Sequence, residues 1–495
     1  MPDTMTAART DRTAVIDVGS NSVRLVIFGD CERAPLAMLN EKAFCALGRG
    51  VSATGHLNAE GVEHAIRTLR RFSWMASCLG ARRVNAFATA AVRDADDGPD
   101  FVERAARETG VELRVLSGEE EAHLAAQGVL FGIPEAEGLV GDMGGSSLEL
   151  AEVGGGVPGR GISLPLGPLQ FADDDNQADQ ISKRVAEELS RPNWLGDGKT
   201  ENLYLVGGTW RAFAKIDIAM RNYGLNIIHG YQMTAARALD LADLIAGQHP
   251  DSLAGEHGVS KRRLQVLPAA SMVLKHLVGF IDPARIIFSA HGVREGAYLE
   301  GLDADVRAQD PLIAGVRAIA AQEARFSDET GKAVFDWISP LFTDETDWQR
   351  RLRLAACLLC DTGWRTHPDY RATQSYRRVL RAPLLALNHA ERTFISISVL
   401  RRYSHKAGDE AIRDARTLLG EKELLAADRI GAAMRLALTL GGGGRNSLQD
   451  FSLSLSDNVL TLQMPSGRPY LASDAVDARL KHLATLFFAR PLIDQ

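Results

Sequence analysis

Three times along the chain, an apolar strand runs into a tight turn of glycine or small polar residues. The three segments are AVIDVGSNSVRLVIF (Ala14–Phe28), VGDMGGSSLELAE (Val140–Glu152) and LYLVGGTWRAF (Leu203–Phe213). In the first two the turn leads into a second strand, and in the third it opens a helix. One such motif alone would fit an ordinary glycine-rich hairpin. Three in order indicate two pseudo-repeated α/β halves that face one ligand.

The second segment has the composition of a phosphate-binding loop. Glycine lets backbone N–H groups approach a phosphate closely, and serine hydroxyls add further donors. The residues of this kind are Gly144, Gly145, Ser146 and Ser147. Asp142 stands just before them, where a hard cation such as Mg²⁺ would contact phosphate oxygens. Glu149 follows two residues after Ser147, on the same face of the next strand.

The other two turns offer similar groups. The first turn follows an acidic residue, Asp17, and the third follows an apolar strand directly. The candidate phosphate-binding residues are Gly19, Ser20, Asn21 and Ser22 in the first turn, and Gly207, Gly208 and Thr209 in the third.

Seven stretches between Ile16 and Gly296 together resemble one known family. They are IDVGSNSVRL (Ile16–Leu25), FATAAVRDA (Phe87–Ala95), SGEEEAHLAAQGV (Ser117–Val129), GDMGGSSLEL (Gly141–Leu150), SLPLGPLQ (Ser163–Gln170), LVGGTWRA (Leu205–Ala212) and HGVREG (His291–Gly296). In this order they are similar to the exopolyphosphatase / guanosine pentaphosphate phosphohydrolase family of the actin-like (sugar kinase and actin) superfamily. The resemblance implies an α/β fold with two actin-like, ribonuclease H-like lobes, at residues 1–137 and 138–310. Family members usually have a third glycine where this chain has Ser146, a difference that would narrow the phosphate loop.

The resemblance also implies roles for individual residues. Acidic residues in a first helical turn normally complement the helix dipole, and a single arginine is normally a surface residue. In the family pattern, however, Glu121 takes the place of the catalytic carboxylate, which orients and deprotonates water. Arg93 would bind phosphate with its planar guanidinium. Mg²⁺ would be held by Asp142, Asp17 and Glu149, so the expected catalytic set is Glu121, Asp142 and Glu149.

The expected reaction is Mg²⁺-dependent hydrolysis of a terminal phosphoanhydride, since no adenine pocket can be recognised in the sequence. Three functions stay open at this point. The first is an exopolyphosphatase that releases orthophosphate from the end of inorganic polyphosphate. The second is a pppGpp 5′-phosphohydrolase that uses the same site. The third is a non-catalytic phosphate or nucleotide sensor, which the presence of Glu121, Asp142 and Arg93 disfavours.

From residue 311 to residue 495 the pattern changes to helices. One long helix is expected at Ala411–Leu440, followed by a β-hairpin around Ser456-Asp457-Asn458 and a final helix. This region resembles the metal-dependent HD phosphohydrolases with an eroded signature, because Cys360-Asp361 stands where His-Asp would be. His367 and His389 remain nearby, but a metal site needs more ligands than these.

The composition is that of a globular chain without a membrane span. Hydrophobic residues make up 45% of the chain and charged residues 24%, and no run approaches the roughly 20 apolar residues that cross a bilayer. The first residues lack the apolar core of a signal peptide, and five scattered cysteines suit a reducing compartment. We therefore expect a cytoplasmic homodimer with no nucleic-acid or membrane partner.

The net charge of −7 is unevenly distributed. Residues 311–495 hold 25 Lys+Arg against 21 Asp+Glu, and the other residues hold 31 against 42. Eight arginines fall within one short stretch of the basic region: Arg350, Arg351, Arg353, Arg365, Arg371, Arg377, Arg378 and Arg381. A solvated helix face would explain them, but a long polyanion needs contacts far from its scissile end. On this ground polyphosphate is favoured over pppGpp. We also expect the two lobes to close on substrate, because loops of both must meet one phosphate.

Overall fold

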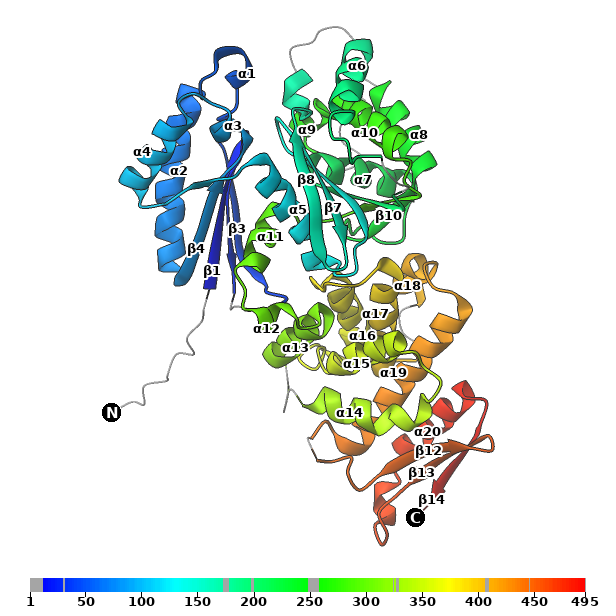
Figure 1. The fold of residues 1–495 in the computed structure, drawn as a ribbon. Coiled ribbons are helices and arrows are strands. Elements are labelled where there is room, and N and C mark those ends of the chain that lie inside the picture. Colours follow the sequence, from blue (N-terminus) through cyan, green and yellow to red (C-terminus); the bar gives the residue numbers. More distant parts are fainter. Residues whose placement is uncertain are drawn as a thin grey trace, which may run out of the picture. The chain divides into compact units, whose positions relative to one another are not determined.

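The chain forms two compact units (Figure 1). The computed structural model describes residues 12–29, 32–171, 178–196, 200–247, 258–323, 325, 329–405, 409–444 and 446–494. Unit 1 comprises the chain up to residue 222 together with residues 226–308, and unit 2 comprises residues 223–225 and 309–495. The first residues, which lack the apolar core of a signal peptide, lie outside the described residues. No helix in the described ranges is long and apolar enough to cross a membrane.

Unit 1 begins with a five-stranded sheet in the order β3-β2-β1-β4-β5. Its strands are β1 (Arg12–Val18), β2 (Ser22–Phe28), β3 (Ala37–Phe44), β4 (Ala81–Ala88) and β5 (Arg114–Val115). The first three form an antiparallel meander, and β4 and β5 join parallel to β1. One face is covered by α2 (Ala59–Cys78), whose apolar residues recur at helical spacing and pack into the core.

A second sheet repeats this order with one strand added. Its strands are β6 (Gly138–Met143), β7 (Leu148–Gly154), β8 (Val157–Leu164), β9 (Asn202–Val206), β10 (Tyr231–Thr234) and β11 (Arg285–Phe288). The sheet order is β10-β11-β9-β6-β7-β8, so the meander β6-β7-β8 corresponds to β1-β2-β3, and β9 and β11 correspond to β4 and β5. The α/β class and the pseudo-repeated halves predicted from the three turns are confirmed. We refer to the halves that contain these sheets as lobe I and lobe II.

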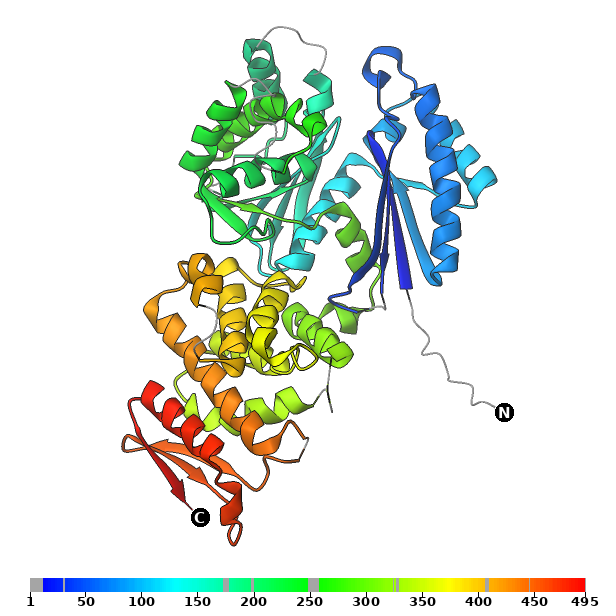
Figure 2. The ribbon, with the colours of Figure 1, turned by 180° about the vertical axis from the view of Figure 1, so that it is seen from behind.

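Two helices lie between the two sheets, as Figures 1 and 2 both show: α5 (Gly118–Gly132) packs on β7 and β8, and α11 (Val293–Glu300) contacts β1. The N-terminus of α5 is fixed by a capping box, in which the Ser117 hydroxyl accepts from the Glu120 N–H and the Glu120 carboxylate accepts from the Ser117 N–H. The two helices touch backbone to backbone. A Cβ at Gly296 would lie 1.9 Å from the Leu124 carbonyl oxygen, so this packing requires glycine.

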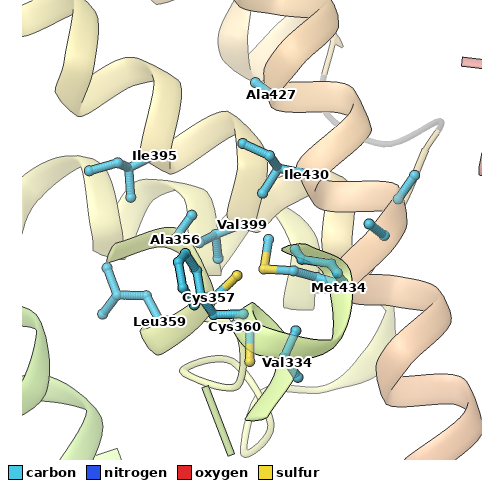
Figure 3. Close-up of a cluster of buried hydrophobic side chains, with 14 of the residues drawn as sticks. Val334, Ala356, Cys357, Leu359, Cys360, Ile395, Val399, Ala427, Ile430 and Met434 are labelled. Atoms are coloured by element: carbon cyan, nitrogen blue, oxygen red, sulfur yellow. The ribbon is translucent and has the colours of Figure 1, made fainter. Parts of the chain in front are cut away.

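Unit 2 is mostly helical, as predicted. Its helices are α13 (Pro311–Glu323), α14 (Thr330–Ile338), α15 (Asp347–Leu358), α16 (Pro368–Arg381), α17 (His389–Tyr403), α18 (Asp409–Arg416), α19 (Glu421–Gly441) and α20 (Asp474–Leu486). The single helix predicted at Ala411–Leu440 is wrong, because the chain leaves helical geometry before Gly420, which caps α19 with an extended ψ of 169°. The core of these helices includes Cys357 and Cys360, both buried among aliphatic side chains (Figure 3).

The predicted hairpin is present as β12 (Ser452–Ser456) and β13 (Val459–Gln463). Asp457 and Asn458 both have positive φ, which is the geometry of a two-residue hairpin turn. A third strand, β14 (Arg490–Asp494), adds parallel to β13. The sequence analysis missed this strand, which is short, lies at the sheet edge and carries a proline.

Candidate active site

A cavity of about 900 Å³ in unit 1 is lined by all three predicted turns. Thirty-three residues from both lobes surround it, and most of the candidates named from the sequence are among them. These are Asp17, Gly19, Ser20, Asn21, Ser22, Glu121, Asp142, Gly144, Gly145, Ser147, Glu149, Gly207, Gly208 and Thr209. Arg93 and Ser146 lie outside its lining.

The turns of β1-β2 and β6-β7 are closed by the same backbone hydrogen bond. Gly19 N donates to Ser22 O at 3.1 Å, and Gly144 N donates to Ser147 O at 3.0 Å. The aspartate stands two residues before the glycine in both. The strand register, however, brings Arg24 opposite Asp17 and brings an acid, Glu149, opposite Asp142. The two loops therefore share a backbone design but differ in charge.

The third turn approaches the second so closely that it must be glycine. Gly207 has a φ of +102°, and a Cβ there would lie 2.8 Å from Asp142 Oδ1. At Gly208 a Cβ would lie 2.4 Å from Arg263 Nη2. The Asp142 carboxylate is thus held against the Gly207 backbone, and the Arg263 guanidinium lies directly over Gly208.

Two carboxyl groups on the β6-β7 hairpin retain protons more tightly than usual: Glu149 is buried, and Asp142 is partly buried at the cavity wall. Burial raises the pKa of Asp142 to about 6, although Arg211 acts in the opposite direction. Burial, followed by the charge of Asp142, raises the pKa of Glu149 to about 7. The Ser163 hydroxyl donates to Glu149 Oε1 at 2.8 Å. These raised pKa values show that the negative charge of the hairpin is not fully compensated by protein groups.

Glu121 lies in the first turn of α5 with only 7% of its surface exposed. Burial, followed by the charge of Glu149, raises the pKa of Glu121 well above its ordinary value, against the opposing effect of Arg93. Arg93 Nη1 donates to Glu121 Oε2 at 3.0 Å and to Leu116 O at 3.2 Å. In this structure Arg93 therefore orients the carboxylate of Glu121, and its predicted contact with phosphate stays a prediction.

The carboxylates present fit a divalent cation on one side of the cavity. Asp17 is held by Arg294, whose Nη1 donates to Asp17 Oδ2 at 3.1 Å. Within the described residues, no three His, Cys, Asp or Glu side chains are grouped closely enough to hold a metal by themselves. Mg²⁺ commonly uses one or two carboxylates together with waters and substrate phosphates. The incompletely compensated pair Asp142 and Glu149 suits that mode of binding.

Five cationic side chains that the sequence analysis did not single out line the same cavity: Arg24, Lys42, Arg211, Arg263 and Arg294. Burial and the charge of Arg24 lower the pKa of Lys42 to about 8. Burial and the charge of Arg294 lower the pKa of Arg211 to about 10. Five cationic side chains that line one cavity provide a favourable environment for an anion.

The arginine-rich stretch of unit 2 does not form the continuous basic surface inferred from the sequence. Arg353 is fully buried and binds Glu345 through both Nε and Nη2. Arg351 pairs with Asp310, and Arg378 pairs with Glu323. Spacing along the sequence could not reveal these acidic partners, so the extended surface of eight arginines is a wrong inference. The exposed members are Arg350, Arg365, Arg377, Arg378 and Arg381.

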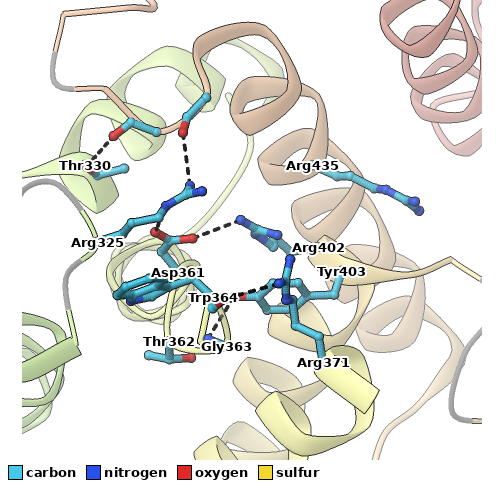
Figure 4. A network of polar contacts seen from close by, with 12 residues as sticks. Arg325, Thr330, Asp361, Thr362, Gly363, Trp364, Arg371, Arg402, Tyr403 and Arg435 are labelled. Carbon is cyan, nitrogen blue, oxygen red and sulfur yellow. Dashed lines mark hydrogen bonds and ion pairs between the residues drawn. The ribbon is translucent and has the colours of Figure 1, made fainter. Parts of the chain in front are cut away.

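The remnants of the HD signature occupy separate environments. Asp361 accepts hydrogen bonds from Arg325 Nε at 3.0 Å and Arg402 Nη2 at 3.1 Å (Figure 4). His389 is buried with its Nδ1 3.0 Å from the Tyr223 hydroxyl, whereas His367 is exposed at the start of α16. Two guanidinium groups therefore surround the aspartate that would bind metal in an HD enzyme.

Comparison with known proteins agrees with this geometry. The Ppx/GppA phosphatase family matches residues 12–304, and the exopolyphosphatase C-terminal family matches residues 313–491. Exopolyphosphatase 1 of Mycobacterium tuberculosis is 28% identical over 332 residues, which cover 63% of this chain and 96% of that protein. Retrograde regulation protein 2 of Saccharomyces cerevisiae is 27% identical over 345 residues, covering 62% of this chain and 58% of that protein.

Solved structures share the fold. The crystal structure of the Aquifex aeolicus Ppx/GppA family member has 26% identity and a TM-score of 0.51, covering 58% of this chain and 96% of its own. An exopolyphosphatase from Cytophaga hutchinsonii has 22% identity and a TM-score of 0.54, and the match covers 59% of this chain and 99% of that chain. With a family model that spans more than half of its length, this chain belongs to the Ppx/GppA phosphatase family.

Proposed function

We propose that the chain is an exopolyphosphatase, which hydrolyses the terminal phosphoanhydride of inorganic polyphosphate and releases orthophosphate. The observation that carries the proposal is the cavity itself, in which two duplicated phosphate loops and Glu121 meet five cationic side chains. A chain terminus with several adjacent negative phosphates suits a cavity lined by five cationic side chains. The relative from Mycobacterium tuberculosis bears the name of this activity.

In the proposed reaction the terminal phosphoryl group lies between the two loops. Backbone N–H groups of the loops that begin at Gly19 and Gly144 donate to its non-bridging oxygens. Glu121 accepts a proton from the attacking water, whose oxygen forms the new bond to phosphorus. The bridging P–O bond breaks, and the shortened chain leaves with the electron pair on its new terminal oxygen. Arg24, Lys42 and Arg263 neutralise charge along the departing chain.

We propose Mg²⁺ as the cation, held by Asp142 and Glu149 together with phosphate oxygens. When bound, it would neutralise charge that develops on the phosphoryl oxygens. Asp17, the third ligand expected from the sequence, is neutralised by Arg294 and would act through that contact instead. Substitution Asp142→Ala should abolish phosphate release at any Mg²⁺ concentration, and chelation should abolish it in the unsubstituted protein. Full activity after exhaustive chelation would remove the metal from the mechanism.

Phosphate release measured in parallel with tripolyphosphate, long-chain polyphosphate and pppGpp tests the substrate. We expect orthophosphate to appear one group at a time from polyphosphate. Far more efficient turnover of pppGpp than of any polyphosphate would reassign the enzyme to the alternative 5′-phosphohydrolase activity at the same site. Phosphate release from none of the three would favour the sensor.

Two further expectations belong to the same proposal. A cytoplasmic location is supported by the free thiols of the described cysteines Cys45, Cys78, Cys357 and Cys360. A homodimer, with no nucleic-acid or membrane partner, stays a prediction that light scattering of the purified chain would test.

A further inference from the structure

The tips of the two phosphate loops are joined by one contact between side chains. Ser20 Oγ, in the turn of lobe I, lies 2.9 Å from Ser146 Oγ, in the turn of lobe II. Ser20 has 6% of its surface exposed. Ser146 lies outside the cavity lining, whereas its neighbours Gly145 and Ser147 line it. The Ser146 hydroxyl therefore points to the other loop and not to the space where phosphate would bind.

The lobe I partner is held in place by its own lobe. Gly48 N donates to Ser20 O at 2.8 Å, and a Cβ at Gly48 would lie 2.9 Å from Ser20 Cβ. The next residue, Asn21, accepts through its carbonyl oxygen from the backbone N–H groups of Cys45 and Ala46. The position of the Ser20 hydroxyl is thus set by the backbone of residues 45–48.

The lobe II partner is held in the same manner. Leu169 N donates to Gly145 O at 2.9 Å, and a Cβ at Gly167 would lie 2.3 Å from the carbonyl carbon of Ser146. Because each hydroxyl is attached to a fixed backbone, the hydrogen bond between them depends on the separation of the two lobes. A glycine, which the family resemblance predicts at position 146, could not make this bond.

We propose that the Ser20–Ser146 hydroxyl pair is an interlobe contact that sets the spacing of the two phosphate loops before substrate binds, with Ser146 as a positioning residue. The inference rests on the proposed function in so far as the loops bind phosphate. A protein whose loops already stand at binding distance loses less conformational freedom when the phosphate arrives. Removal of the pair should therefore weaken binding of every ligand that ends in phosphate by a similar factor, and should change the catalytic rate of the bound complex little.

A double-mutant cycle tests the coupling between the two hydroxyls. Binding of orthophosphate and of tripolyphosphate is measured by calorimetry, with chelator present so that no turnover occurs. Loss of one neutral hydrogen bond predicts a roughly 2- to 10-fold weaker Kd for Ser146→Ala and Ser146→Gly. Ser146→Thr, which keeps the hydroxyl, should bind as tightly as the unsubstituted protein. In a Ser20→Ala background, Ser146→Ala should weaken binding no further. Additive losses, or equal losses for Thr and Ala at position 146, would overturn the proposal.

A second experiment measures the distance between the two lobes. If Ser146 acted only within its own loop, its substitution would not change this distance. Spin labels are placed at Glu103 and Lys183, both about four-fifths exposed and located in lobe I and lobe II. Cys31 and Cys78 are replaced by serine to prevent labelling there. We expect one narrow distance distribution for the ligand-free reference protein, a broader one for Ser146→Gly, and a narrow one again when orthophosphate saturates Ser146→Gly. Identical distributions for the two ligand-free proteins would overturn the proposal. Neither experiment depends on hydrolysis. A failure of the proposed function can therefore be distinguished from a failure of this inference.

Discussion

At the scale of single residues, two kinds of side chain define the site. Acids whose negative charge is not fully offset by the protein lie in the same cavity as several cationic side chains. Asp142 and Glu149 have raised pKa values because they are buried, whereas Lys42 has a lowered one for the same reason and because other cations surround it. Both deviations would decrease if a divalent cation and a polyphosphate chain bound as proposed. A site of this kind reduces the stability of the empty protein in favour of ligand binding.

The first prediction is that Glu149→Gln stabilises the metal-free protein. The folded-state pKa of Glu149, about 7, lies above its ordinary value of 4.5, so folded protein retains a proton that unfolded protein has released. Stability is therefore lost as the pH rises through this window. In chelator at pH 8, the substitution should raise the free energy of unfolding by roughly 1–3 kcal/mol, and the gain should shrink toward pH 4.5.

Glu152→Gln is the matched control on the same strand. Arg160 hydrogen-bonds Glu152 and lowers its pKa, so loss of that charge should give no gain in stability at pH 8. Denaturant unfolding of both variants at several pH values makes the comparison. Lower stability of Glu149→Gln than of the reference protein at pH 8 would contradict the account of this carboxylate.

How much of the site the sequence reveals depends on the kind of residue. The acids and small residues of the loops are predictable because their chemistry lies in consecutive positions, as in Gly144–Ser147. Arg263 could not be predicted in this way, because it reaches the cavity from a separate helix. Arg211 stands two residues after Thr209 in the third motif, and the sequence analysis did not single it out. The pairing of Arg93 with Glu121 joins residues 28 positions apart and is likewise absent from any local pattern.

At the scale of secondary-structure elements, the spacing of functional groups depends on how α5 and α11 pack. Glu121 lies in the first turn of α5, and Arg294 lies in the first turn of α11. Their close contact at Gly128 and Gly296 leaves no room for a side chain. The contact between them depends on tertiary packing, which no local sequence pattern reveals.

The second prediction is that Gly296→Ala disrupts this contact. Since the added methyl group would meet the Leu124 carbonyl oxygen of the adjacent helix, the helices must separate, at a cost of about 1–3 kcal/mol. Phosphate release should fall as well, because Glu121 and Arg294 shift relative to each other. Thermal unfolding and phosphate release measure the two effects.

The control for this substitution is Gly279→Ala in α10 (Leu267–Ile281), where no atom lies within 4 Å of the added Cβ. Alanine has the higher helix propensity, so this variant should be neutral or more stable by up to about 1 kcal/mol. If the two variants were equally stable and equally active, the α5–α11 contact would not position the site.

At the scale of the whole molecule, the cavity belongs to unit 1 and the net positive charge to unit 2. The match to the relative from Mycobacterium tuberculosis covers 96% of that protein but only 63% of this chain. That relative therefore has no counterpart for much of the rest of this chain. We expect unit 2 to contribute to the binding of long chains more than to the chemical step. The internal ion pairs of Arg351, Arg353 and Arg378 reduce the surface available for this role.

The third prediction concerns the exposed arginines of α16. Replacement of Arg377 and Arg381 by glutamine in the full chain should weaken hydrolysis of long polyphosphate and leave tripolyphosphate hydrolysis unchanged. The effect should diminish at high salt, because mobile ions screen exposed charges. Truncation after Asp310 should act in the same direction and more strongly. Equal effects on all chain lengths would show that unit 2 does not bind the distal chain.

The most direct test of the central claim is phosphate release from polyphosphate by Glu121→Gln, with Glu119→Gln as the control. Both residues lie in the first turn of α5, but Glu119 is exposed and Glu121 is buried in the cavity. A general base contributes roughly 10²–10⁴-fold to rate and little to ground-state affinity. We therefore predict that Glu121→Gln loses activity by that factor while it binds tripolyphosphate with unchanged Kd, and that Glu119→Gln stays fully active. Release of phosphate by Glu121→Gln at the rate of the unsubstituted protein would contradict the assignment of this cavity as the hydrolytic site.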